Sequence, residues 1–226
     1  MQLNKKLLLF FFFSITSYCF SKNKTNDSLL TILKSGATEV EKVSALLKLS
    51  EASSNSDTAL MYANKALVLA NLVKYTTGIA ESNKKLGKCY MQSGNNDMAI
   101  ESFLNAIDFY QQFNDKTGIG KCNYNIGLIY YKIADYTKSL NYLLKAMEMF
   151  EQIGDKYLIS LCSGNLGNIY YLQKNYDESL KYHFKSLHIS EELRDENGLA
   201  KNNNNIGLVY IDKKIIPKHW NTKIKQ

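Results

Sequence analysis

The chain repeats its own pattern every 40 residues, and this period limits the folds that are open to it. Four glycines stand at that interval, and a tyrosine follows each of them three positions later. Such regular spacing is typical of a repeat protein, in which each unit packs mainly on its neighbours and several units build one continuous core. The two columns are Gly87, Gly127, Gly167 and Gly207, and Tyr90, Tyr130, Tyr170 and Tyr210.

The sequence of each unit predicts a pair of helices. In the unit that contains Gly127, residues 116–133 carry apolar side chains at three-and-four spacing, which places them on one face of a helix. Residues 136–153 repeat this pattern, and Gly154 then offers a left-handed cap. The single proline among 226 residues agrees with a largely helical chain. We therefore expect an all-α fold built from antiparallel helix pairs.

The glycine column predicts a close contact between the two helices of each unit. A glycine inside a helix costs about 1 kcal/mol relative to alanine, so its presence needs a packing reason. Gly127 on the first helix, and Ser139 and Ala146 on the second, are small enough for the two backbones to approach. Tyr130 and Leu143 would fill the space around them.

These columns resemble a known family. In the units of Gly87, Gly127 and Gly167 they are followed by small, large and small side chains at fixed offsets. The pattern resembles the tetratricopeptide repeat in its 40-residue form, which implies a right-handed α-solenoid of antiparallel helix pairs. The matching segments are LGKCY at 86–90, IGLIY at 126–130, LGNIY at 166–170 and IGLVY at 206–210.

The period sets the expected organisation of the chain. The expected parts are an export signal at 1–21, a lead-in at 22–37, an atypical first repeat at 38–74, repeats at 75–114, 115–154 and 155–194, the first helix of an incomplete fifth repeat at 195–212, and a basic tail at 213–226.

The resemblance also implies a function and a binding surface. Proteins of this family bind peptides or protein segments on a concave wall that is lined by the first helix of each unit. One column of that wall is Lys85, Asn125, Asn165 and Asn205. Because a carboxamide both donates and accepts hydrogen bonds, an asparagine row could hold the backbone of an extended peptide. The alternative is that asparagine simply tolerates a solvated helix face. The other expected wall residues are Lys84, Lys88, Lys121, Tyr124, Tyr131, Lys132 and Asn168.

A more specific hypothesis is a clamp for a carboxylate, as in the chaperone-binding members of the family. Lys84, Lys88 and Asn125 would form it. The next unit supplies Leu161 and Asn165 at the positions where that clamp needs two cations. The pattern therefore favours a general peptide groove over the specific clamp.

The net charge of +7 does not indicate a nucleic-acid partner. Of the 28 basic residues, two lie in the export signal and five in the last fourteen residues, which leaves 21 against 21 acidic residues in the array. The basic stripe that phosphate binding requires is missing there, so we expect no nucleic acid as partner.

The sequence gives little support for catalysis. It contains no phosphate-binding loop, nucleophile elbow or pair of carboxylates at catalytic spacing. His183 stands in the column of Phe103 and Leu143, which predicts a packing role, and the histidines lack companions at metal-ligand spacing. Cys122 and Cys162 share a column and are expected to be buried, with a redox pair as the alternative. We expect no enzymatic activity, no metal and no cofactor.

The first 21 residues have the form of an export signal. Lys5 and Lys6 precede an apolar run, and small residues lead to a cleavage point after Ser21. An uncleaved anchor and a lipid on Cys19 are the alternatives. We expect a periplasmic or cell-surface protein, with membrane attachment left open.

The chain breaks its repeat after Lys214. The second helix of the fifth unit is replaced by residues 215–226, which have no amphipathic period and contain Pro217. Leu199, Ile206 and Val209 would then form an uncovered apolar face. Back-translation of this segment in another reading frame yields an amino-acid sequence that resembles the repeat, so we interpret the break as a frameshift.

Two functions remain open at this stage. The first is the exported sensing or interaction region of a truncated bacterial signalling protein, with a membrane tether and an output domain encoded downstream. The second is a free-standing adaptor in the periplasm or on the cell surface. In both cases the partner is a peptide or protein segment.

Overall fold

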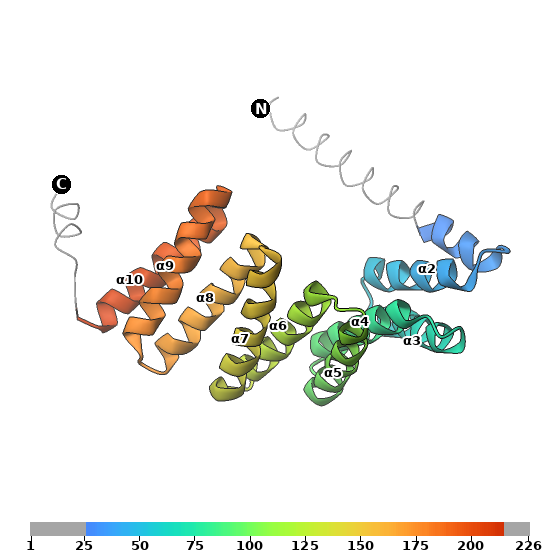
Figure 1. Cartoon of the computed structure of the whole chain (residues 1–226), viewed down its shortest axis with the longest axis horizontal. Coiled ribbons are helices and arrows are strands. Elements are labelled where there is room, and N and C mark those ends of the chain that lie inside the picture. Colours follow the sequence, from blue (N-terminus) through green and yellow to red (C-terminus); the bar gives the residue numbers. More distant parts are fainter. Residues whose placement is uncertain (1–25, 215–226) are drawn as a thin grey trace, which may run out of the picture. The chain divides into compact units, whose positions relative to one another are not determined.

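A computed structural model describes residues 26–214, and every regular element among these residues is a helix (Figure 1). Residues 26–34 are helical and precede the labelled elements. The expected all-α fold is therefore confirmed. The labelled helices are α2 (Glu39–Ala52), α3 (Ser56–Leu72), α4 (Thr76–Ser93), α5 (Asn96–Gln112), α6 (Lys116–Lys132), α7 (Tyr136–Ile153), α8 (Lys156–Leu172), α9 (Tyr176–Leu193) and α10 (Glu196–Asp212).

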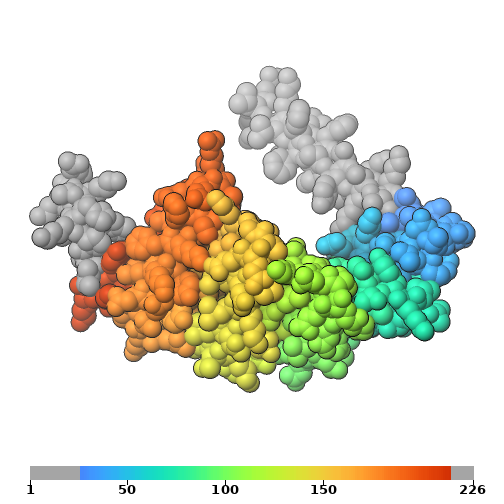
Figure 2. Space-filling model, in the orientation of Figure 1, coloured from blue at the N-terminus to red at the C-terminus, as the bar shows by residue number. Residues whose placement is uncertain are grey.

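The chain divides into two compact units, Met1–Phe109 and Tyr110–Gln226, and the boundary falls within α5. In the first unit, α2 packs on α3 and α4, and α3 packs on α4. In the second unit, each helix from α6 to α10 packs on the next one along the chain. The space-filling view accordingly shows the segments of the second unit in sequence order, from yellow-green to red (Figure 2). The contacts are thus local in sequence, as a repeat architecture requires.

Aspartates begin several helices of the second unit. The side chains of Asp115, Asp135 and Asp155 each accept a hydrogen bond from the amide three residues later, at 2.9, 3.1 and 3.0 Å. These bonds satisfy amides that have no partner within the helix. The helix α7 ends at Gly154 with φ of 70°, which confirms the expected left-handed cap.

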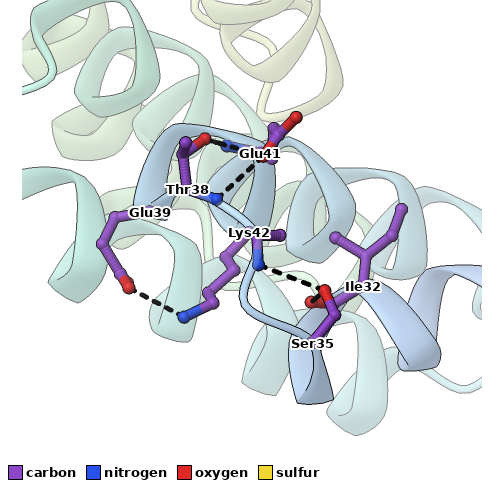
Figure 3. A network of polar contacts seen from close by, with 7 residues as sticks. Ile32, Ser35, Thr38, Glu39, Glu41 and Lys42 are labelled. Atoms are coloured by element: carbon purple, nitrogen blue, oxygen red, sulfur yellow. Dashed lines mark hydrogen bonds and ion pairs between the residues drawn. The ribbon is translucent and has the colours of Figure 1, made fainter.

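The helix α2 begins with a reciprocal cap (Figure 3). The Thr38 amide donates to Glu41 Oε2 at 2.8 Å, and the Glu41 amide donates to Thr38 Oγ1 at 3.3 Å. The hydrogen bonds that the Thr38 amide and the Thr38 hydroxyl donate to the Glu41 carboxylate lower the pKa of this carboxyl. Glu39 and Lys42 form an ion pair beside the cap at 2.8 Å. Thr38 is therefore the N-cap of α2, in a capping box with Glu41.

The glycine column forms close contacts within the helix pairs. A Cβ added to Gly127 would lie 2.8 Å from Leu143 Cγ, and one added to Gly167 would lie 2.7 Å from the His183 ring. In the first unit, Gly87 meets the Phe103 ring at 2.7 Å in the same way. Real Cβ atoms do not approach other atoms so closely, so only glycine fits. The expected packing role of the column is confirmed.

Serine hydroxyls join the same helix pairs from the other side. Ser139 Oγ donates to the Gly127 carbonyl at 2.7 Å, and Ser179 Oγ donates to the Gly167 carbonyl at 2.9 Å. Both serines are fully buried. Each buried hydroxyl donates a hydrogen bond to the carbonyl of the partner helix, so neither of the two is left without a partner.

Tyrosines of the second column also pack between paired helices. Tyr130 stacks on Tyr142 with ring centroids 5.6 Å apart, and Tyr170 stacks on Tyr182 at 5.5 Å. The ammonium of Lys138 lies 5.0 Å from the Tyr130 centroid. The abundance of tyrosine is therefore explained in part by this column, as the repeat pattern predicts.

His183 is a core residue. It is 1% exposed, its ring covers Gly167, and its Nδ1 has no hydrogen-bond partner among the described residues. Burial lowers the pKa of His183 from its ordinary value of 6.5 to about 4. The expected packing role is confirmed, and the imidazole is neutral at neutral pH.

The cysteines of the repeat column are buried thiols. Cys122 and Cys162 are both fully buried, and burial raises the pKa of Cys162 to about 12. A thiol with such a pKa stays protonated at neutral pH, which makes it a poor nucleophile. The buried interpretation is confirmed.

The prediction of an uncovered apolar face on α10 is wrong. Ile206 and Val209 are 5% and 1% exposed, because α10 packs on α9 through them. Leu199 is half-buried. The exposed apolar side chains of this helix are instead Leu208 and Ile211. The face that was expected to need another helix is the face that packs on the preceding repeat.

Across residues 26–214, none of the helices combines the length and the apolar character that a membrane crossing needs. The expected export signal at 1–21 and most of the basic tail, 215–226, lie outside the described residues.

We expect Gly167→Ala to lower the free energy of unfolding by up to about 2 kcal/mol, because overpacking against His183 costs about 1–3 kcal/mol and alanine regains about 1 kcal/mol of helix propensity. Urea denaturation followed by circular dichroism measures this change. The matched control is Gly164→Ala on the same helix, where the nearest atom would lie at 3.7 Å. The control should raise stability by up to about 1 kcal/mol. Equal effects at both positions would contradict the contact.

We expect the buried His183 to make the protein sensitive to mild acid. Its folded pKa lies below its unfolded pKa, so the unfolded chain binds the proton more readily, and stability present above pH 6.5 falls as the pH drops towards 4. The two pKa values give a loss of about 2 kcal/mol between pH 7 and pH 5. Urea denaturation at both pH values measures it. In His183→Leu, which copies Leu143 of the preceding repeat, this loss should disappear, whereas exposed His188→Gln should retain it.

Candidate functional site

A row of carboxamides runs along the first helices of the second unit. Asn125, Asn165 and Asn205 occupy the same repeat position in α6, α8 and α10, and all three are half-buried. Asn125 Nδ2 donates to the Lys121 carbonyl at 2.7 Å, and Asn165 Nδ2 donates to the Leu161 carbonyl at 2.9 Å. The amides are therefore anchored on their own helices, one turn back. We call these three residues the carboxamide row.

Two members of the row also link successive repeats. Asn165 Nδ2 donates to the Tyr124 hydroxyl at 3.0 Å, and Asn205 Nδ2 donates to Asn168 Oδ1 at 3.1 Å. With its bond to Leu161, the amide of Asn165 uses both of its protons inside the protein. What this residue offers to a ligand is its carbonyl oxygen. The row is thus an array of oriented acceptors.

Two members of the row, Asn165 and Asn205, border a cavity of about 580 Å³, which we call the polar pocket, whereas Asn125 does not line it. Tyr124, Asn165, Asn168 and Asn205 line its wall, and Asn202 lines it from α10. Carboxamides and hydroxyls supply most of its polar groups. Burial raises the pKa of the Tyr124 phenol, so its hydroxyl remains a neutral donor and acceptor at neutral pH. The volume lies in the range of pockets that hold small molecules or several side chains.

A smaller cavity of about 240 Å³ shares part of this lining. Asn168 and Asn205 border both cavities, and Tyr131 and Tyr171 border the smaller one. Tyr171 is held in place by a hydrogen bond of 2.6 Å from its hydroxyl to Asp212. The structure therefore brings together Tyr124, Tyr131, Asn165, Asn168 and Asn205 from the expected wall.

The expected basic residues are not gathered at this site. Lys121 and Lys132 are exposed and line neither cavity. In the first unit, Lys84 pairs with Glu81 at 2.7 Å, and burial is the main cause that lowers the pKa of Lys85. Lys88 is half-buried.

The carboxylate clamp remains a prediction. Its two lysines, Lys84 and Lys88, belong to the first compact unit, whereas Asn125 belongs to the second. The ion pair between Lys84 and Glu81 occupies one of the two cations that the clamp would use.

Sequence reasoning missed the floor of the polar pocket. Ser160, Ser186 and Gly198 line it together with Asn202, and none of them belonged to the expected wall. The repeat alignment carried a signal for one of them, because Ser186 stands in a column of alanines at 66, 106 and 146. A polar residue in a small apolar column marks a layer whose packing differs from the others.

The described residues contain no group of three or more histidine, cysteine, aspartate or glutamate side chains that could hold a metal ion. The polar pocket instead offers neutral hydrogen-bonding groups, with one acidic and one basic residue at its edge, Asp195 and Lys201. Such a surface can bind a polar ligand through hydrogen bonds, and it presents no nucleophile with an activating base.

Two family models match the chain, and both describe the tetratricopeptide repeat. One matches residues 77–152 and the other matches residues 161–197, which together make up half of the chain. The chain belongs to the tetratricopeptide repeat family. Repeats of this family typically mediate protein–protein interaction and are generally non-catalytic. No curated protein sequence matches the chain significantly.

Solved structures share this fold. Aspartyl phosphate phosphatase F from Bacillus subtilis gives a TM-score of 0.76 at 18% identity, with 82% of this chain and 49% of that protein covered. A Rap protein complexed with Competence and Sporulation Factor gives 0.73 at 16% identity, with 89% and 60% covered. A signal transduction ATPase from Pyrococcus horikoshii with a tetratricopeptide repeat sensor gives 0.71 at 20% identity, with 78% and 28% covered. At these identities the likeness shows the fold alone.

Proposed function

We propose that the protein is a scaffold that binds a peptide or protein segment along the carboxamide row of its second unit. The observation that carries the proposal is the pair of cross-repeat hydrogen bonds that fix Asn165 and Asn205 beside the polar pocket. Fixed acceptors lose little conformational freedom when a ligand binds, so each hydrogen bond contributes more to affinity.

An extended peptide suits this surface. Its backbone amides have no partners of their own and can donate to the carbonyl oxygens of the row, whatever side chains the peptide carries. Side-chain preference would then come from the cavities beside the row. The complex of the Rap protein named above supports the idea that this fold can hold a ligand.

We infer further that the protein is the exported sensing or interaction region of a bacterial signalling protein. Residues 1–21, with their basic start and apolar run, support export. The sensor that the Pyrococcus horikoshii protein carries supports a signalling role for repeats of this kind. A free-standing adaptor at the same location is the second candidate.

Fusion to alkaline phosphatase, which is active only outside the cytoplasm, tests the location. We expect active enzyme in a bacterial host from a fusion that keeps residues 1–21. The same fusion without these residues should be inactive. Equal activity of both fusions would contradict export, because the expected signal would then have no effect.

A peptide selection tests the binding function. The protein is used to select from a displayed library of random peptides, and the affinities of the selected peptides are measured by fluorescence polarisation. We expect Asn125→Ala, Asn165→Ala and Asn205→Ala in one variant to weaken binding at least about tenfold, because three hydrogen bonds of about 0.5–1.5 kcal/mol each are lost. The matched control replaces three exposed asparagines of second helices, Asn71, Asn105 and Asn141, with alanine. Equal affinities of the two variants would rule out the row as the binding surface.

A further inference from the structure

One layer of the second unit breaks the apolar pattern of the repeats. Residues 40 positions apart occupy equivalent places, and in the preceding layer these places hold Gly120, Ala146, Phe150 and Cys162. There the Phe150 ring covers Gly120, so that a Cβ on the glycine would lie 2.5 Å from the ring. Phe150 and Cys162 belong to one buried core cluster.

The layer between α8, α9 and α10 holds polar residues at all four places. They are Ser160, Ser186, Ser190 and Asn202, and we call them the polar layer. The ring of Phe150 thus has no counterpart, because a serine stands at the equivalent position. Ser186, Ser190 and Asn202 are nevertheless buried, at 3%, 1% and 4% exposure. A large apolar contact has been exchanged for small buried polar groups.

The polar layer is connected by its own hydrogen bonds. Ser160 Oγ and Ser186 Oγ lie 2.9 Å apart, and Asn202 Nδ2 donates to Ser186 Oγ at 2.9 Å. Ser186 Oγ also lies 3.0 Å from the Ser160 carbonyl. Longer contacts of 3.5 Å join Ser190 Oγ to Ser160 and to Asn202. A connected network of this kind holds its members in fixed orientations.

Three of the four residues of the polar layer form part of the floor of the polar pocket. Ser160, Ser186 and Asn202 all line the cavity of about 580 Å³. Gly164 lies over them, and a Cβ there would stand 3.7 Å from Ser186 Oγ and 4.0 Å from Asn202 Oδ1. Because Gly164 has no side chain, it adds no bulk between these two residues and the cavity that they line. The serine in place of an aromatic ring and the bare glycine both leave space at this layer.

The charges around the pocket nearly cancel. Asp195 and Lys201 are the two charged residues in the lining, and their charges are opposite. Asp195 differs from Asp115 and Asp155 because its side chain makes no capping hydrogen bond to the helix that it begins. A ligand group with a full charge would face one residue of like charge as well as one of opposite charge, so the loss of its hydration would be poorly offset. A neutral group with both donors and acceptors fits the lining better.

We propose that the polar pocket is a specificity site for the neutral carboxamide side chains of a bound peptide, glutamine or asparagine. The inference rests on the proposed peptide-binding function and names the side chains that this segment carries. A carboxamide has one acceptor and two donors, which match the amides and the oxygens of the pocket. An apolar side chain would leave the carboxamide oxygen of Asn165, whose amide protons are already used inside the protein, without a partner, and this loss is the basis of discrimination.

Titration with a capped amino acid, followed by amide NMR of the protein, tests the pocket directly. The probe is N-acetyl-L-glutamine amide, and N-acetyl-L-leucine amide and N-acetyl-L-glutamate amide are its controls. With the glutamine probe we expect saturable chemical-shift changes at the amides of Gly164, Ser186 and Asn202. The dissociation constants of both controls should be at least about tenfold larger. Equal shifts with the leucine or glutamate probe, or no saturable shift with glutamine, would overturn the inference.

A filled variant provides the matched comparison. Ser160→Gly, Ser186→Ala, Ser190→Phe and Asn202→Cys together install the residues of the preceding layer. We expect this protein to keep its NMR dispersion and to lose the glutamine response. The single variant Ser190→Phe serves the same purpose if the fourfold variant does not fold. Persistence of the response in a folded, filled variant would contradict the pocket.

The titration and the peptide selection can fail separately. The selected peptides could bind the carboxamide row without any preference for glutamine or asparagine. This result would support the scaffold function and contradict the specificity site. Saturable glutamine binding at the polar pocket, with no peptide selected, would support the specificity site and contradict the proposed binding of an extended peptide.

Discussion

The close contact between a glycine on one helix and a large side chain on its partner is the constraint on which this structure depends. At Gly127 and Gly167 the partner side chain occupies the space that a Cβ would need, and a buried serine hydroxyl holds the glycine carbonyl from the second helix. The spacing of the two helices is therefore fixed by atoms in contact. A fixed spacing places the same positions of each first helix in register, which is what aligns the carboxamide row.

Much of the fold was predictable from the sequence because its determinants are periodic. The glycine and tyrosine columns predict the helix pairs. Gly154 predicts the end of a helix, because glycine readily adopts the left-handed conformation of the cap. The uncovered face expected on α10 was wrong for an instructive reason. Ile206 and Val209 were assigned to a missing partner, whereas they pack on the preceding repeat. Periodicity identifies an apolar face, but it does not tell on which side the neighbour lies.

The candidate site was predictable only in part. Family columns located Tyr124, Asn165 and Asn205, since these positions recur from unit to unit. The floor of the polar pocket does not recur, and it depends on Ser190 and Asn202 departing from their columns together. Each departure alone looks like an ordinary substitution. Their connection is a property of three-dimensional packing, since only the fold brings α9 and α10 close enough for the two side chains to meet.

The local character of the contacts has a consequence for how such a protein can change. Every pair of helices that packs within the second unit is close in sequence, so each layer is stabilised mainly by itself and its two neighbours. One layer can therefore exchange its chemistry, as the polar layer has done, while the Phe150 layer beside it stays apolar and closed. Each layer can therefore vary separately during evolution. Ligand recognition can change in one layer while the stability of the other layers is kept.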